Sequence, residues 1–234
     1  MKRFYNDVAV AASADGWQVE LDGRGVRSQA KRLPQAVPSE ALARLLAKEW
    51  EEQGETIAPE RFVMRDLADY AIDVVASDRE GAIARLLPYA ETDTLCYRAE
   101  PDEPLYRRQV AVWNPLLDRL QERHGIALKP QSGIVHKPQD AAMMAKAGTR
   151  LSSLGAFELA AAETMAPLAA SLTIALLALE PDADIDKLWN AAELEEAWQR
   201  EQWGADAEAE RRSELRREAF VAAARFAAAA RSAD

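Results

Sequence analysis

The spacing of apolar residues changes once along this chain, near Pro38, and this change limits the folds that the chain can adopt. Before it, Trp17, Val19 and Leu21 alternate with polar residues, and turn-forming Asp-Gly pairs flank them. Alternation with a period of two is typical of a half-buried strand. Residues 8–37 are therefore predicted to form a small antiparallel meander.

After Pro38 the apolar residues lie three or four positions apart, as on one face of a helix. Ser39 is placed to cap a helix that carries Leu42, Leu46 and Trp50, and we expect this helix to cover the meander. The helical pattern then continues over Leu67 to Val75, Ser77 to Leu87, Gln109 to Arg123 (interrupted or restarted at Asn114-Pro115), Ser152 to Thr164, Leu168 to Leu179, Asp184 to Gln202 and Asp206 to Ser232.

These patterns predict an α+β fold with two unequal domains. Residues 1–62 form a small N-terminal antiparallel β-sheet with its covering helix, and residues 63–234 form a larger all-α helical domain. The segment Ile126–His136 is the exception, because its proline, its glycine and the β-branched pair Ile134-Val135 suggest an extended hairpin. That this hairpin packs back on the N-terminal sheet is left open.

Charge and cysteine content exclude several classes of function. A net charge of -10 and a pI near 4.9 argue against nucleic acid or an anionic membrane as partner, because an acidic surface repels both. The single Cys96 allows no intramolecular disulfide, as expected in a reducing compartment.

The strongest apolar run, Met165 to Leu179, is shorter than the roughly twenty residues that span a bilayer, so we expect a buried core helix. The start of the chain does not resemble a secretory signal, and a cytoplasmic location is expected.

The residues that enzymes need are mostly missing from the sequence. No glycine-rich phosphate loop occurs, and the two histidines, His124 and His136, have no second ligand at metal-binding spacing. A cysteine nucleophile would need a base close in space, and Cys96 with His136 stays open because such partners need not be adjacent in sequence. A lone cysteine between Leu95 and Tyr97 is more often a small buried hydrophobe. No cofactor and no metal are expected.

Carboxylates enter an apolar stripe on the helix that is predicted to begin at Asp184. Helical spacing carries this stripe into Glu195, Glu196, Gln199 and Trp203. Two interpretations stay open: a half-buried surface whose charges pair internally, or a functional site with Trp203 as an anchor for protein contacts. The same two interpretations apply to Glu49 beside Trp50.

Short motifs along the whole chain resemble those of one protein family. They are Arg3-Phe4-Tyr5, Leu21-Asp22-Gly23-Arg24, Glu49-Trp50 with Gln53-Gly54-Glu55, Ala71-Ile72-Asp73, Tyr89 to Arg98, Trp113 to Leu117, Leu154 to Leu159, and Gln199 with Trp203-Gly204 and Asp206. This series resembles the assembly chaperones of the F-type ATP synthase that bind the alpha subunit of its soluble catalytic sector. Such proteins occur in mitochondria and in related bacteria.

The resemblance implies a two-domain chaperone that needs no nucleotide or metal and that holds the ATP synthase alpha subunit before it pairs with beta. It also implies that Glu195 or Glu196, with Gln199 and Trp203, belongs to the partner-binding surface, and the choice between the two glutamates stays open. A bacterial, cytoplasmic member is expected, although a processed mitochondrial-matrix chain would look the same. Two other hypotheses stay open: a hydrolase that uses Cys96 or the Glu195/Glu196 face, and a generic adaptor protein.

Overall fold

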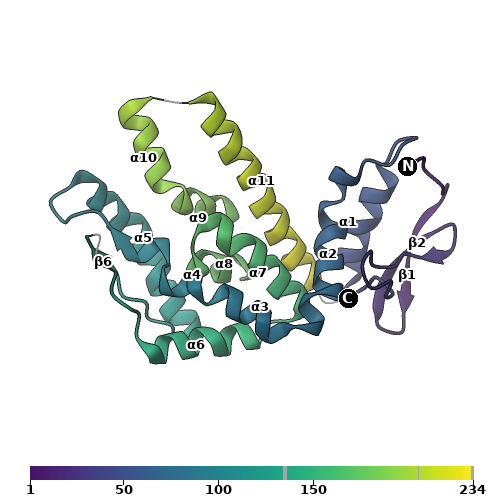
Figure 1. Ribbon diagram of the computed structural model, residues 1–234, viewed down its shortest axis with the longest axis horizontal. Helices are drawn as coiled ribbons and strands as arrows, with labels where there is room; N and C mark the ends of the chain where they lie inside the picture. Colours follow the sequence, from purple (N-terminus) through teal and green to yellow (C-terminus); the bar gives the residue numbers. More distant parts are fainter. Residues whose placement is uncertain (134–135, 205, 233–234) are drawn as a thin grey trace. The chain divides into compact units, whose positions relative to one another are not determined.

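The structure, a computed structural model, describes residues 1–133, 136–204 and 206–232. These residues divide into two compact units. Unit 1 comprises residues 1–79, 155–161 and 225–232, and unit 2 comprises the other described residues. A small antiparallel sheet lies in the N-terminal part and helices make up most of the rest, so the predicted α+β class is confirmed (Figure 1). The domain boundary at residue 62 stays a prediction.

Unit 1 contains an antiparallel sheet formed by β1 (Val8–Ser13), β2 (Gly16–Leu21), β3 (Arg24–Gly25) and β4 (Ala36–Val37). β2 is central, because it pairs with each of the other three strands. Asp22 and Gly23 connect β2 to β3 with φ angles of 47° and 73°. Positive φ at both central positions is what a tight type I′ hairpin turn requires. The meander predicted from the alternating residues is therefore confirmed.

Helix α1 (Glu40–Glu51) covers this sheet, as the sequence predicted, and contacts β1 and β2. The Ser39 hydroxyl caps the helix by accepting a hydrogen bond from the backbone N–H of Leu42 at 3.1 Å. Leu42, Leu46 and Trp50 are buried on its inner face. A 3₁₀ turn (Pro59–Arg61), α2 (Val63–Asp73) and a second 3₁₀ turn (Val75–Ser77) follow.

The carboxylate of Glu49 has a structural partner in this unit. Phe62, the residue before α2, makes no side-chain cap, and the two oxygens of Glu49 accept hydrogen bonds from the backbone N–H groups of Met64 (2.7 Å) and Arg65 (2.9 Å) instead. A carboxylate at a helix N-terminus satisfies free N–H donors and complements the helix dipole. Glu49 thus joins α1 to the start of α2.

The remaining elements are α3 (Arg79–Leu86), α4 (Pro88–Glu91), a 3₁₀ turn (Thr94–Cys96), β5 (Tyr97–Arg98), α5 (Pro104–His124), β6 (Gln131–Ser132), α6 (Ala141–Ser152), α7 (Ala156–Ala169), α8 (Leu172–Ala178), α9 (Ile185–Ala192), α10 (Leu194–Trp203) and α11 (Ala207–Ala230) (Figure 1). Every residue of α8 is buried, which confirms a core helix within the apolar run. No helix in the described part of the chain is both long and apolar enough to cross a membrane.

Asp93 joins the start of α8 to the 3₁₀ turn before β5. This carboxylate is fully buried and accepts hydrogen bonds from the Ser171 hydroxyl (2.7 Å) and from the backbone N–H groups of Leu95 (3.0 Å) and Thr173 (2.8 Å). Burial raises the pKa of Asp93, and these hydrogen bonds act in the opposite direction. The motif around Asp93 therefore has a packing role in unit 2.

Several predicted element boundaries are wrong. α5 runs through Pro115 without interruption, and α6 falls where no helix was predicted. The helix predicted from Asp184 to Gln202 is two helices that break at Glu193. At this break the buried Glu193 carboxylate accepts a hydrogen bond from the Ser213 hydroxyl at 2.6 Å and lies 3.2 Å from the Arg216 guanidinium, so it contacts a distant helix, α11.

The segment Ile126–His136, for which an extended hairpin is predicted, contains one short strand among its described residues. Its short strand β6 pairs with β5 in parallel, with Gln131 opposite Tyr97, and both strands belong to unit 2. A parallel partner comes from a distant part of the chain, so the pairing of β6 with β5 is not that of a local hairpin. Ile134 and Val135, on which the prediction rested, lie outside the described residues.

Candidate functional site

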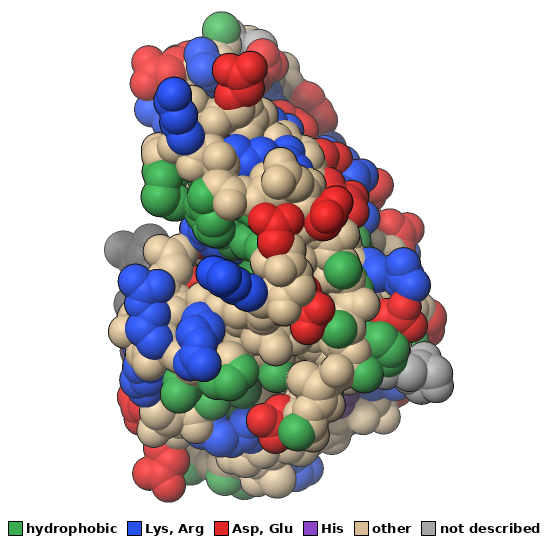
Figure 2. Space-filling model, turned by 90° about the vertical axis from the view of Figure 1, so that its right-hand side faces the viewer, with side chains coloured by type: hydrophobic (Ala, Val, Ile, Leu, Met, Phe, Trp, Pro, Cys, Tyr) green, Lys and Arg blue, Asp and Glu red, His purple; other side chains and the backbone are tan. Residues whose placement is uncertain are grey.

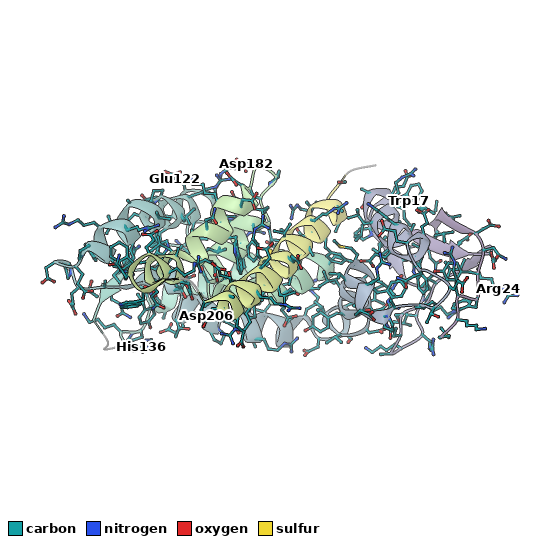
Figure 3. The ribbon with its side chains drawn as sticks, turned by 90° about the horizontal axis from the view of Figure 1, so that it is seen from above. Trp17, Arg24, Glu122, His136, Asp182 and Asp206 are labelled. Atoms are coloured by element: carbon teal, nitrogen blue, oxygen red, sulfur yellow. The ribbon has the colours of Figure 1, made fainter. Side chains whose placement is uncertain are left out.

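A groove of about 450 Å³ lies between α10 and α11 in unit 2. Figure 1 shows these two helices leading away from the short helices α8 and α9. The walls of the groove include Glu196, Gln199, Arg200 and Trp203 from α10. The first turns of α11 form the other wall. Asp206, labelled in Figure 3, caps α11 by accepting hydrogen bonds from two backbone N–H groups of that helix. This is the surface on which most of the predicted site residues meet.

Trp203 is the most unusual side chain of the groove, because it is 79% exposed. Trp50, Trp113 and Trp189 are buried in the core, as most tryptophans of this chain were expected to be. Trp198, also on α10, is partly covered, and the Arg108 guanidinium lies 5.8 Å from its ring. A tryptophan that is left open on a groove wall is the kind of side chain that anchors protein contacts.

The structure separates the two glutamates that the sequence left undecided. Glu196 is exposed and lines the groove with Gln199 and Trp203. Glu195 is half-buried, and its Oε1 accepts a hydrogen bond from Gln109 Nε2 of α5 at 2.6 Å. Burial raises the pKa of Glu195, the Gln109 hydrogen bond opposes this rise, and the neighbouring Glu196 adds to it. Three of the four predicted residues are thus together, and the fourth joins α10 to α5.

Arginines of α11 line the groove and were not predicted as site residues. Arg212 and Arg216 lie one turn apart, so both face the groove, and Arg216 is held by Glu193 and by a hydrogen bond to the backbone oxygen of Leu168 at 2.6 Å. Their spacing of four residues on a predicted helix was a usable signal. The groove therefore presents an aromatic ring, an amide, a carboxylate and guanidinium groups.

Cys96 is not arranged as a nucleophile. Its side chain is fully buried, and burial, followed by the nearby Asp93 charge, raises the pKa of the thiol. The reactive species of a cysteine nucleophile is the thiolate, which this environment disfavours. His136, proposed as its base, is exposed and shares a hydrogen bond of 2.7 Å with the Tyr97 hydroxyl, while its other nitrogen lies 3.4 Å from Glu91. The geometry gives no support to a hydrolase that uses Cys96 with His136 as its base.

Within residues 1–133, 136–204 and 206–232, no three His, Cys, Asp or Glu side chains gather in a way that could hold an ion.

A model of the ATP12 chaperone protein family matches residues 2–121, about half of the chain. The chain belongs to the ATP12 chaperone family. The crystal structure of Atp12 from Paracoccus denitrificans is 32% identical, aligns over 98% of either chain and gives a TM-score of 0.93. The crystal structure of the Atu1473 protein from Agrobacterium tumefaciens is 35% identical and aligns over 97% of this chain and 85% of that chain, with a TM-score of 0.90.

A curated relative is the mitochondrial protein atp12 of Schizosaccharomyces pombe, which is 25% identical in an alignment of 216 residues; the alignment covers 87% of this chain and 74% of the relative. Membership in the ATP12 family confirms the predicted resemblance and makes this chain a chaperone. The ligand of a chaperone is another protein, so an open aromatic side chain on a helical groove suits the family.

Proposed function

We propose that this ATP12-family chaperone serves the assembly of the F-type ATP synthase by binding its unassembled alpha subunit through the groove between α10 and α11. The chaperone keeps the alpha subunit from aggregating until beta pairs with it. Family membership supports the chaperone role, and the exposure of Trp203 on the groove is the observation that supports this surface. The setting proposed is a bacterial cytoplasm, or the mitochondrial matrix for a processed chain.

Physical chemistry supports this task. A subunit that later shares a large interface exposes apolar surface while it is alone, and such surface aggregates. Trp203 offers a large ring to cover part of that surface, and the polar groups around it suit a contact that must be released again. The proposal needs no nucleotide and no metal in this chain.

We assign different roles to the two glutamates. Glu196, exposed on the groove, is the carboxylate that contacts the alpha subunit, and Glu195 holds α10 against α5 through Gln109. Losing one partner of a desolvated charge pair at an interface typically costs about 2 to 5 kcal/mol, whereas a charge at the rim mainly changes the association rate. The size of the effect at Glu196 therefore tells whether its carboxylate is buried in the complex.

The test is a titration of purified alpha and beta subunits, separately, against this protein in buffer that contains chelator and no nucleotide. We expect saturable binding of alpha and no binding of beta, together with less light scattering from alpha on warming. Equal binding of both subunits, binding of neither, or a strict need for metal or nucleotide would contradict the proposal.

The surface is tested with Glu196→Gln and Glu195→Gln, each melted before titration. Glu196→Gln should weaken alpha binding without changing stability, and Glu195→Gln should leave binding intact. Glu218→Gln is the matched control, because Glu218 is exposed on α11 and does not line the groove. If neither Glu196→Gln nor the double variant weakens binding while the fold is intact, the groove is the wrong surface.

A further inference from the structure

Unit 1 has a pocket of about 630 Å³ beside the sheet. Its apolar wall comes from the first residues of the chain, from β2 and from α1, and includes Phe4, Tyr5 and Trp50. The other wall carries the arginines Arg24, Arg27, Arg32 and Arg65. The pocket shares no lining residue with the groove between α10 and α11.

The arginines are unusual in a chain with a net charge of -10. Arg24, Arg27 and Arg32 are exposed, and none of them forms an ion pair within the described residues. The carboxylate among the lining residues, Asp22, already accepts hydrogen bonds from the backbone N–H groups of Asn6 (3.0 Å) and Asp7 (2.8 Å). Asp22 stays a negative charge near Arg24, but four arginines line the pocket against this one carboxylate, so positive charge is in excess there.

Figure 2, which faces the side of the molecule where β1 and β2 lie in Figure 1, shows Lys and Arg side chains gathered next to hydrophobic ones. In Figure 3 the labelled Arg24 side chain extends away from the ribbon of unit 1 into open space. A charged group in this position is free to meet a ligand.

The apolar wall is built from ordered aromatic rings. Phe4, which is 61% exposed, meets Tyr5 edge-on at 5.3 Å between ring centroids, and Tyr5 meets Trp50 in the same way at 5.5 Å. The Arg65 guanidinium lies 3.8 Å from the ring centroid of Phe62 behind them. Trp50 Nε1 is buried without a hydrogen-bond partner. Phe4 is therefore an exposed ring on a rigid base, as interface anchors usually are.

We propose that this pocket binds an acidic segment of another polypeptide, with an apolar side chain of the segment against Phe4 and its carboxylates on Arg24, Arg27 and Arg32. Arginine pairs well with carboxylates, and arginines mixed with aromatic rings are typical of protein interfaces. A nucleic acid is disfavoured, because the chain as a whole would repel a long polyanion. The apolar wall favours a peptide over a free inorganic anion.

The test uses the full chain and a short fluorescein-labelled peptide that alternates Glu with Leu or Phe, followed by fluorescence anisotropy. The same peptide with Gln in place of Glu is the second probe. Arg24→Gln combined with Arg27→Gln is compared with a control that removes the same charge elsewhere, Arg107→Gln combined with Arg211→Gln. Arg107 and Arg211 are exposed and do not line either hollow. Urea denaturation confirms that each variant is folded.

We expect the Glu peptide to bind more tightly than the Gln peptide, and the Arg24/Arg27 variant to bind it about tenfold more weakly, with the control unchanged. Phe4→Ala should also weaken binding. Equal affinity in wild type and the Arg24/Arg27 variant, or an equal loss in the control, overturns the proposal. Displacement of the peptide by inorganic phosphate or a single-stranded oligonucleotide at matching charge concentration overturns it as well, because the pocket would then bind anions in general.

Discussion

Replacing Trp203 by alanine should weaken binding of the alpha subunit by a large factor and leave the fold unchanged. The side chain is 79% exposed, so the folded protein loses little packing when it is removed. Covering the exposed part of a tryptophan, about 160 Å², at about 25 cal/mol per Å² gives an upper limit of about 4 kcal/mol. Ordering the ring in the complex costs part of this binding free energy. We therefore expect Trp203→Ala to weaken binding by about 2 to 3 kcal/mol, or about 30- to 150-fold in Kd.

The measurement is isothermal titration calorimetry of the alpha subunit into wild type, Trp203→Ala and Leu215→Ala. Leu215 is the matched control, because it is 58% exposed on α11 and does not line the groove. The unfolding free energies of both variants should lie within about 0.5 kcal/mol of wild type, as for exposed positions in general. Wild-type affinity in Trp203→Ala, or an equal loss in Leu215→Ala, would refute the reasoning.

Three further predictions concern stability and reactivity. Glu49→Ala should lower the free energy of unfolding in urea by about 2 kcal/mol, because two N–H groups of α2 lose their acceptor, while Glu51→Ala on the same helix should change it little. Burial raises the pKa of Glu195, so the native state binds the Glu195 proton more tightly than the unfolded state does. The free energy of unfolding of wild type should therefore fall relative to that of Glu195→Gln as pH rises above about 4.5. An equal pH dependence of the two unfolding free energies would contradict this. The Cys96 thiol should react with a thiol reagent only after denaturant is added, and Cys96→Ser should retain alpha binding; rapid reaction of the native protein would contradict its burial.

Local features of the fold could be predicted from the sequence because their causes lie within a few residues. The Asp22-Gly23 turn is one example, since both residues adopt the positive φ that such a turn requires. The capping of α1 by Ser39 is another. The full burial of α8 follows from a composition that is apolar at every position except Thr173. In these cases local preference and tertiary structure agree.

Features that depend on distant residues were missed. In the sequence, Glu193 does not stand out from the long helical pattern around it. In the structure, α9 ends at this residue, and the Glu193 carboxylate contacts Ser213 and Arg216 on α11. α6 has only Ala147 and Leu151 buried, so its apolar stripe was too weak to show a helix.

The candidate site was predicted in part. The helical pattern placed Glu196, Gln199 and Trp203 on one region of α10, and the structure places them on one groove. It also placed Glu195 there, although Glu195 turns to Gln109 of α5, a contact across 86 residues of chain. The pocket of unit 1 could not be predicted by spacing, because its walls come from four separate parts of the chain.

Hydrogen–deuterium exchange of this protein with and without the alpha subunit tests the central proposal most directly, because it reports where the partner binds. The account predicts slower exchange in peptides from α10 (Leu194–Trp203) and the first turns of α11 when alpha is added, and no change when beta is added. The control region is α6 (Ala141–Ser152), which should exchange at the same rate in all samples. Binding of alpha with protection confined to other segments would contradict the account.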